Sequence, residues 1–222
     1  MFEEKDFLKV EFSVRSKAGD LIDTTDEASA KKAGVYDEHK RYGESLVVLS
    51  DQRMIKGFRN ALLAAEAGKA QTVTLSPADA FGERDETLIK LIPLQKFKDN
   101  GVSPVVGMPV TLDQYRGRVQ SVSGGRVRVD LNHELAGKEV TYEFTVKKCI
   151  TGDAEKLEAI IDEAFQGGVS AAIAGKEAHV KAGMKALSAE GYGDRKAAAL
   201  QNALLYIPEI SKITWTEEFE RG

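Results

Sequence analysis

Two segments far apart in the chain alternate strictly between apolar and polar residues. Every second residue is large and apolar in residues 8–15 and again in residues 140–147: Leu8, Val10, Phe12 and Val14, then Val140, Tyr142, Phe144 and Val146. Because successive side chains of a strand point to opposite faces, this pattern predicts strands with one face in a core and the other in water. Such strands are typical of antiparallel sheets.

Helical patterns lie between and after these strands. Phe58, Ala61 and Leu62 share one side of a helix that Met54–Phe58 opens and that Gly68 ends. After Thr151-Gly152, apolar residues at helical spacing predict two further helices, from about Asp153 and from about Asp194, with short strands between and after them. Residues 26–44 are polar and predicted to be irregular. The sequence therefore predicts an α+β fold.

The segment from about residue 87 to residue 136 differs from the rest of the chain in composition and charge. It holds three of the five prolines and short alternating strands around a hairpin turn at Ser123-Gly124-Gly125. It carries seven Lys and Arg against four Asp and Glu, whereas the whole chain has a net charge of −4. This contrast predicts a separate small β-rich unit.

Several classes of protein are disfavoured. The acidic first residues and the lack of an apolar run near 18 residues argue against a secretory signal and a membrane span, so we expect a cytoplasmic protein. One cysteine and three scattered histidines give no zinc pattern, and no phosphate loop or dinucleotide fingerprint occurs. We therefore expect no metal and no cofactor. The weak overall charge disfavours nucleic acid as a partner.

Three motifs occur in a characteristic order: Gly19-Asp20-Leu21-Ile22-Asp23-Thr24-Thr25, then Met54-Ile55-Lys56-Gly57-Phe58, then Ala78-Asp79-Ala80-Phe81-Gly82-Glu83. Together they resemble an FKBP-type peptidyl-prolyl cis-trans isomerase. The run from Asp130 to Lys138 resembles the return from the insert-in-flap domain of SlyD-like and archaeal members. The tail resembles the extra C-terminal domain of the long archaeal type.

The resemblance implies a half-barrel antiparallel sheet around one helix. It assigns residues 1–86 and 137–152 to the isomerase domain, residues 87–136 to an insert-in-flap chaperone domain, and residues 153–222 to a C-terminal α/β domain.

The resemblance also implies the site. Matched by position, the catalytic residues are Phe12, Asp23, Ile55, Phe58, Phe81 and Tyr142, and the substrate-binding residues are Ile22, Met54 and Leu135. Phe58 forms the floor under the proline ring, and the backbone N–H of Ile55 meets a substrate carbonyl. The sequence departs from the small family members, which often carry tyrosine at Phe12 and Phe81 and tryptophan at Phe58. Packing in the core is the alternative role for these three phenylalanines, and a simple turn is the alternative for Asp23.

The implied function is isomerisation of Xaa-Pro bonds and chaperoning of unfolded or nascent polypeptides that contain proline. The alternative is a holdase-type binding module with little isomerase activity. Apolar residues of the insert, from Ile89 to Val106, supply either a client surface or the insert's own core. A competing hypothesis is RNA binding through Arg116, Arg118, Arg126 and Arg128. For the tail, the resemblance raises dimerisation as a hypothesis, and the lack of a His-rich end predicts no metal there.

Overall fold

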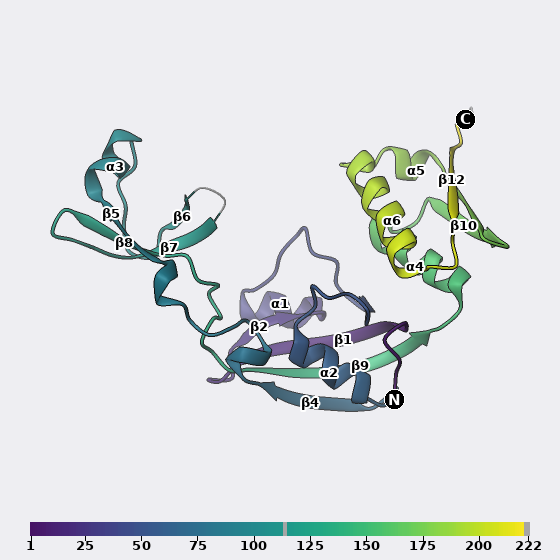
Figure 1. The fold of residues 1–222 in the computed structure, drawn as a ribbon, viewed down its shortest axis with the longest axis horizontal. Helices are drawn as coiled ribbons and strands as arrows, with labels where there is room; N and C mark the ends of the chain where they lie inside the picture. The colour runs from purple at the N-terminus through teal and green to yellow at the C-terminus, as the bar shows by residue number, and fades with distance from the viewer. Residues whose placement is uncertain (113–114, 220–222) are drawn as a thin grey trace. The chain divides into compact units, whose positions relative to one another are not determined.

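The computed structural model describes residues 1–112 and 115–219. The chain forms two compact units, one made of Met1–Val73 with Thr141–Gly222 and the other of Thr74–Val140 (Figure 1). No helix in the described part of the chain is both long enough and apolar enough to cross a membrane. Each unit is described by itself below.

The first unit is built on a sheet with the strand order β2-β1-β9-β4, and β3 pairs with the other end of β1. Its strands are β1 Phe7–Ser16, β2 Leu21–Thr24, β3 Ser45–Val48, β4 Ala70–Leu75 and β9 Val140–Ile150. Both β2 and β3 run antiparallel to β1. Leu8 and Val10 are fully buried and Val14 is 3% exposed, so the predicted alternation of β1 is confirmed.

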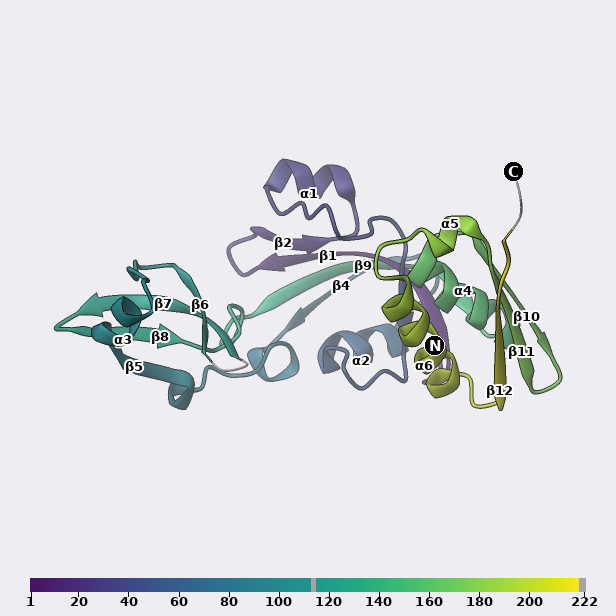
Figure 2. The ribbon, with the colours of Figure 1, turned by 90° about the horizontal axis from the view of Figure 1, so that it is seen from above.

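Two helices occur in the chain segments that connect the strands of this sheet. Helix α2, Lys56–Ala64, buries Gly57, Phe58 and Leu62, which confirms the predicted helix and its buried side. Its predicted end at Gly68 was wrong, because the helix stops at Ala64 with Ala65 as its C-cap. Helix α1, Glu27–Ala33, corrects the prediction that residues 26–44 are irregular throughout; it lies next to β2 (Figure 2). Asp26 caps its start by accepting a hydrogen bond from the Ser29 N–H at 2.7 Å. Only Ala30 is buried, so α1 has no apolar stripe that a sequence reading could detect.

The C-terminal segment of the first unit adds a second, smaller sheet. Its elements are α4 Asp153–Phe165, β10 Val169–Ala174, β11 Glu177–Ala182, α5 Met184–Leu187, α6 Tyr192–Tyr206 and β12 Lys212–Glu217. The strand order is β10-β11-β12; β10 and β11 are antiparallel, and β11 and β12 are parallel. Helix α4 packs on α6 and on β10. The mixed α/β character of this segment follows from these elements.

The C-terminal segment shares its core with the first sheet. Phe7, at the start of β1, is fully buried in the same cluster as Leu157 and Ile160 of α4, and Val48 packs against that cluster. The rings of Phe7 and Tyr206 meet edge to face at 6.4 Å. The C-terminal segment therefore rests on the first sheet instead of forming an isolated core, and the expected boundary at residue 153 stays a prediction.

The second unit contains a four-stranded antiparallel sheet in the order β5-β8-β7-β6 (Figure 1). Its elements are η1 Pro77–Asp79, η2 Glu86–Leu88, β5 Ile89–Pro93, α3 Leu94–Asp99, β6 Pro109–Leu112, β7 Tyr115–Ser123 and β8 Arg126–Asp130. Val119, Val127 and Val129 form its buried core. The unit is β-rich as predicted, with the short helix α3 in addition.

Candidate functional site

Three aromatic side chains from three different elements meet on one face of the first sheet. The rings of Phe58 from α2 and Tyr142 from β9 stack with their centroids 4.3 Å apart. Phe12 from β1 lies 5.8 Å from Phe58 and 6.2 Å from Tyr142. Phe144 packs edge-on against Phe58 at 5.4 Å. We call Phe12, Phe58, Tyr142 and Phe144 the aromatic cluster; it brings together three of the predicted catalytic residues.

Strand alternation explains why these residues converge. Phe12 shares a face of β1 with the buried Val10 and Val14, and Tyr142 shares a face of β9 with Phe144. Phe58 and Tyr142 are each 5% exposed, whereas Phe12 is half-buried. The cluster is therefore apolar, and water has little access to Phe58 and Tyr142, whereas Phe12 lies at a partly open edge.

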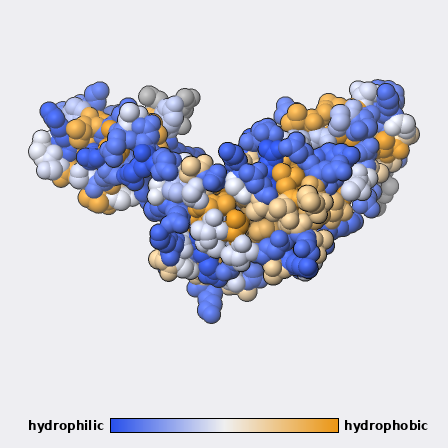
Figure 3. Space-filling model, turned by 60° about the horizontal axis from the view of Figure 1, so that its bottom comes forward, coloured by the Kyte–Doolittle hydropathy of each residue, from blue (hydrophilic) through white to orange (hydrophobic). Residues whose placement is uncertain are grey.

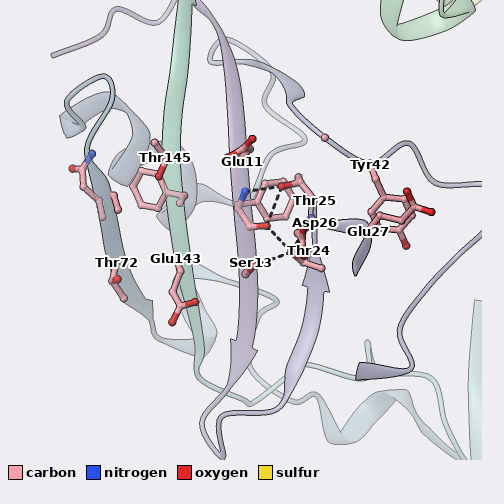
Figure 4. A pocket seen from close by; sticks show the side chains of 15 residues that line it. Glu11, Ser13, Thr24, Thr25, Asp26, Glu27, Tyr42, Thr72, Glu143 and Thr145 are labelled. Atoms are coloured by element: carbon pink, nitrogen blue, oxygen red, sulfur yellow. Dashed lines mark hydrogen bonds between the residues drawn. The ribbon is translucent and has the colours of Figure 1, made fainter. Parts of the chain in front are cut away.

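Two buried threonines hold the backbone of Phe12 and the end of β2 together. The Phe12 N–H donates to the Thr25 hydroxyl at 3.0 Å, and the Phe12 carbonyl accepts from the Thr25 N–H at 2.9 Å and from the Thr24 hydroxyl at 3.2 Å (Figure 4). Thr24 and Thr25 are 1% and 4% exposed. Because Asp23 precedes Thr24 directly, this network also fixes where Asp23 lies relative to the aromatic cluster.

Asp23 is paired with a lysine that sequence reasoning did not identify. The Lys40 ammonium forms an ion pair with the Asp23 carboxylate and donates to the Thr24 carbonyl at 2.9 Å. The same ammonium lies 5.8 Å from the Phe12 ring centroid and 5.6 Å from the Tyr42 ring centroid, within the range of cation–π attraction. Lys40 stands in an irregular stretch without periodicity, so no sequence signal links it to Asp23.

Burial governs the ionisation of the Tyr142 hydroxyl. Desolvation, with a further contribution from the negative charge of Asp23, raises the pKa of Tyr142 to about 12. The phenol therefore stays neutral at physiological pH and is available as a hydrogen-bond donor inside the site.

The residues just before α2 present a free backbone donor. Met54 and Ile55 are half-buried, and Ile55 is the N-cap residue of α2. Its carbonyl accepts from the Arg59 N–H at 2.9 Å, while its own N–H has no acceptor among the described residues. A helix N-terminus favours partial negative charge, so this N–H suits a peptide carbonyl. Ile22, also half-buried, precedes Asp23 in β2.

Two further predicted site residues, Phe81 and Leu135, belong to the second unit. Phe81 stacks on His133 with the ring centroids 4.5 Å apart. Leu135 is 8% exposed and donates its N–H to His133 Nδ1 at 3.2 Å. His133 thus links both residues, which sequence reasoning did not foresee. Their part in a common pocket with the aromatic cluster stays a prediction.

A polar hollow of about 730 Å³ lies along the first sheet, and its lining includes neither Phe58 nor Tyr142 (Figure 4). Glu11, Ser13, Glu143 and Thr145 contribute to its wall. These residues alternate with Phe12 and Phe144 along β1 and β9, so their side chains point to the opposite face from the aromatic cluster. Phe12 and Phe144 also line the hollow, so it borders the aromatic cluster at these two residues, although Phe58 and Tyr142 do not contribute to it.

The described side chains offer little for covalent or metal chemistry. Among the described residues, no group of three or more His, Cys, Asp or Glu is arranged to hold a metal ion. Burial, with the nearby Asp6, raises the pKa of the half-buried Cys149 thiol, which disfavours the reactive thiolate. The aromatic cluster, Asp23 and the Ile55 N–H can bind and orient an apolar peptide group without forming a bond to it.

Comparison with known proteins agrees with this arrangement. The family model described as "FKBP26, IF domain" matches residues 90–135, which overlap the four-stranded sheet of the second unit. This match confirms that an insert-in-flap domain is present, while the boundaries at residues 87 and 136 stay a prediction.

Curated relatives extend the similarity to most of the chain. The "Short-type peptidyl-prolyl cis-trans isomerase" of Methanocaldococcus jannaschii is 31% identical over 155 residues, which cover 70% of this chain and 98% of that protein. The "FKBP-type peptidyl-prolyl cis-trans isomerase SlyD" of Treponema pallidum is 28% identical over 166 residues, covering 72% of this chain and 86% of that protein. The chain therefore belongs to the FKBP-type peptidyl-prolyl cis-trans isomerases.

Proposed function

We propose that this protein catalyses cis-trans isomerisation of Xaa-Pro peptide bonds and assists the folding of unfolded or nascent polypeptides that contain proline. The observation that carries this proposal is the aromatic cluster, nearly dry and lying beside Asp23, in a chain of the FKBP-type family. Polypeptides are the substrates that such a site fits, because it combines an apolar floor with a free backbone donor.

The chemistry needs only rotation about one bond. Partial double-bond character of the C–N bond sets a barrier of about 18–20 kcal/mol, and uncatalysed exchange takes tens of seconds or more. The twisted transition state loses amide resonance, and its carbonyl is less polar than the planar one. An apolar pocket that excludes water therefore binds the twisted form better than water solvates it.

Each residue of the site has a role in this proposal. Phe58, stacked on Tyr142, forms the floor under the proline ring. The Ile55 N–H donates to a substrate carbonyl, and Phe12 forms a side wall. Asp23, held by Lys40, supplies the charged wall that orients the peptide. Ile22 and Met54 are the remaining residues of the first unit that line the proposed pocket. Phe81 and Leu135, from the second unit, are proposed to close it.

The insert supports the chaperone part of the proposal. A groove of about 490 Å³ in the second unit is lined by Ile92, Phe97, Met108, Val110 and other residues. Val105 and Val106, in the loop that leads into Met108, are 62% and 69% exposed. Large apolar side chains left open to water in this way are typical of a surface that binds apolar segments of other polypeptides.

A holdase without isomerase activity is the second candidate. It is favoured by the exposed apolar residues of the insert, Leu91, Val105 and Val106, which can bind a client without any bond rotation. The two candidates differ in whether the aromatic cluster accelerates bond rotation.

A protease-free assay on a short fluorescent Xaa-Pro peptide separates them. We expect the wild-type chain to accelerate isomerisation and Asp23→Ala to slow it by about tenfold, equivalent to about 1.4 kcal/mol in the barrier. Asp20→Ala, an exposed aspartate in the same region, is the matched control and should keep the wild-type rate. A wild-type chain with no effect on the peptide would favour the holdase.

Dimerisation and location are finer proposals. Leu204 and Leu205 of α6 are 49% and 67% exposed, which supports a homodimer through the C-terminal segment. Sedimentation of the wild-type chain and of a Leu204→Ser, Leu205→Ser variant would test this. The cytoplasmic location expected from the sequence stays a prediction.

A further inference from the structure

The outer face of the insert sheet carries a row of arginines. Val127 and Val129 of β8 and Val119 of β7 point into the core of the second unit, so the residues that alternate with them point outward. These are Arg126 and Arg128 on β8 and Arg116 and Arg118 on β7. We call these four residues the arginine face; all four are exposed.

The arginine face is only weakly neutralised. Arg118 approaches Glu134 at 3.8 Å and Arg128 approaches Glu86 at 3.7 Å, both near the limit for an ion pair. Arg116 and Arg126 have no ion pair among the described residues. Asp130, the carboxylate on this face, is already bound by Arg84. The insert is thus a region of net charge +3 in a chain of net −4.

Apolar side chains border the arginines on the same face. In the register of β5 and β8, Leu91 lies opposite Arg128 and Pro93 lies opposite Arg126. Leu91 is 61% exposed, and β5 is an edge strand of the sheet. In the view of Figure 3, hydrophobic residues of this unit form small patches separated by hydrophilic ones. The face therefore offers a line of cations beside a line of apolar groups.

We propose that the arginine face, together with Leu91 and Pro93, binds segments of unfolded client polypeptides in which acidic and apolar residues are mixed. This inference rests on the proposed function and adds a preference for client sequence. A guanidinium presents a fork that matches a carboxylate with two parallel hydrogen bonds, and Leu91 receives a neighbouring apolar side chain of the client.

An acidic polypeptide fits this face better than a nucleic acid does. Single-stranded nucleic acid is held by aromatic rings on which bases stack, in addition to cations. Among the described residues, the strand positions on this face hold arginine, aspartate, serine, glutamine, threonine, proline, leucine and isoleucine. The exposed ring of Tyr115 precedes Arg116 in β7 and therefore belongs to the other face of the strand. The row of phosphates would find its cations but no stacking platform.

The test measures binding of the full-length chain to three fluorescent probes by anisotropy. Two are unstructured peptides with the same apolar residues and one proline, flanked by glutamates in one and by glutamines in the other; the third is a short single-stranded RNA. The variant is Arg126→Gln with Arg128→Gln. The matched control is Lys90→Gln with Lys98→Gln, which removes the same charge from the insert but away from this face, since Lys90 is paired with the inward Val129.

We expect the Arg126→Gln, Arg128→Gln variant to bind the glutamate peptide about five- to tenfold more weakly, as exposed charge pairs imply. Its affinity for the glutamine peptide should stay unchanged, and the lysine control should bind both peptides as wild type does. Added salt should weaken wild-type binding to the glutamate peptide alone.

Three results would overturn the proposal: equal loss for both peptides, an equal effect of the lysine control, or RNA that binds more tightly than the glutamate peptide and depends on Arg126 and Arg128. Isomerisation of a short Xaa-Pro peptide, measured on the same samples, should be the same for wild type and variant. A wild-type chain without isomerase activity would contradict the proposed function. The preference for acidic segments would still be decided separately, by the binding measurements.

Discussion

The aromatic cluster and the insert bury their apolar side chains to very different degrees. Phe58 and Tyr142 are each 5% exposed, and the centroids of their rings are 4.3 Å apart. The insert buries three valines fully or nearly so, yet leaves Leu91, Val105 and Val106 more than half exposed. One region is built around a closed aromatic floor, and the other keeps apolar surface open.

This difference matches two kinds of work on a polypeptide. Lowering the barrier to rotation of one bond needs a pocket whose groups are already in place, because reorganisation at the moment of reaction would cost free energy. Holding many unrelated unfolded segments needs open surface that tolerates different side chains. We expect substitutions in the two regions to separate isomerisation from client binding.

The largest effect is expected from Phe58→Ala, which empties the floor of the aromatic cluster. Loss of a buried phenylalanine costs about 3–5 kcal/mol of unfolding free energy, and we expect the rate on a short Xaa-Pro peptide to fall at least tenfold. Chemical denaturation and the peptide assay measure the two quantities. Phe58→Trp, which restores an aromatic floor, should keep most of the activity; if both variants were as active as wild type, Phe58 would be a packing residue alone.

A smaller loss is expected from Val127→Ala, the matching cavity in the insert. Removing two methyl groups from a fully buried valine costs about 2 kcal/mol, and Val127 is one of only three buried residues at the centre of this described core, against which partly buried side chains pack. Binding of an unfolded client should weaken on mild heating, while turnover of a short peptide stays at the wild-type rate. Parallel loss of both activities would contradict the division between the two regions.

Lys40 sharpens the description of the aromatic cluster. Lys40→Met keeps the length of the side chain but removes the charge that holds Asp23, and a partly exposed ion pair contributes about 0.2–1 kcal/mol. We therefore expect isomerisation to slow by about two- to fivefold, with Lys40→Arg close to wild type. If the methionine variant turned over peptide at the full rate, Asp23 would not need Lys40 for its position.

The last prediction concerns alkaline pH and changes stability, not the rate of isomerisation. Because the pKa of Tyr142 is raised to about 12 in the folded chain, its contribution to stability is fully present below its ordinary value near 10 and is lost as pH rises toward 12. Unfolding free energy should therefore fall between pH 10 and pH 12 more steeply for wild type than for Tyr142→Phe. Identical slopes would show that the Tyr142 phenol is not desolvated.

Sequence reasoning found the parts of the site that periodicity and motif order encode. The alternation along β1 and β9 placed Phe12 and Tyr142 on buried faces, and the apolar side of α2 placed Phe58. Lys40 could not be found in this way because it lies in an irregular segment that brings it to Asp23 of β2 without any periodic pattern. The stacking of His133 on Phe81 depends on how the two ends of the insert meet, and no local pattern records that.

The contact between β1 and the C-terminal helices was also hidden from the sequence. Phe7 sits one residue before the alternating run of β1, on the face that the pattern marks as polar, and there it joins the C-terminal helices. A single apolar residue on a polar face carries no periodic signal, although it connects two sheets. The tail packs on β1 through Phe7, and the domain boundary that Thr151-Gly152 predicts stays a prediction.

Removal of the insert tests the division of work most directly. The Leu131 N–H donates to the Leu88 carbonyl at 3.1 Å, so the two ends of the insert sheet lie together, and a short glycine-serine linker can replace residues 89–130 while His133 and Leu135 stay in place. We predict that this variant turns over a short Xaa-Pro peptide at the wild-type rate but no longer accelerates the proline-limited refolding of a whole protein. Equal loss of both activities in a folded variant would contradict the account.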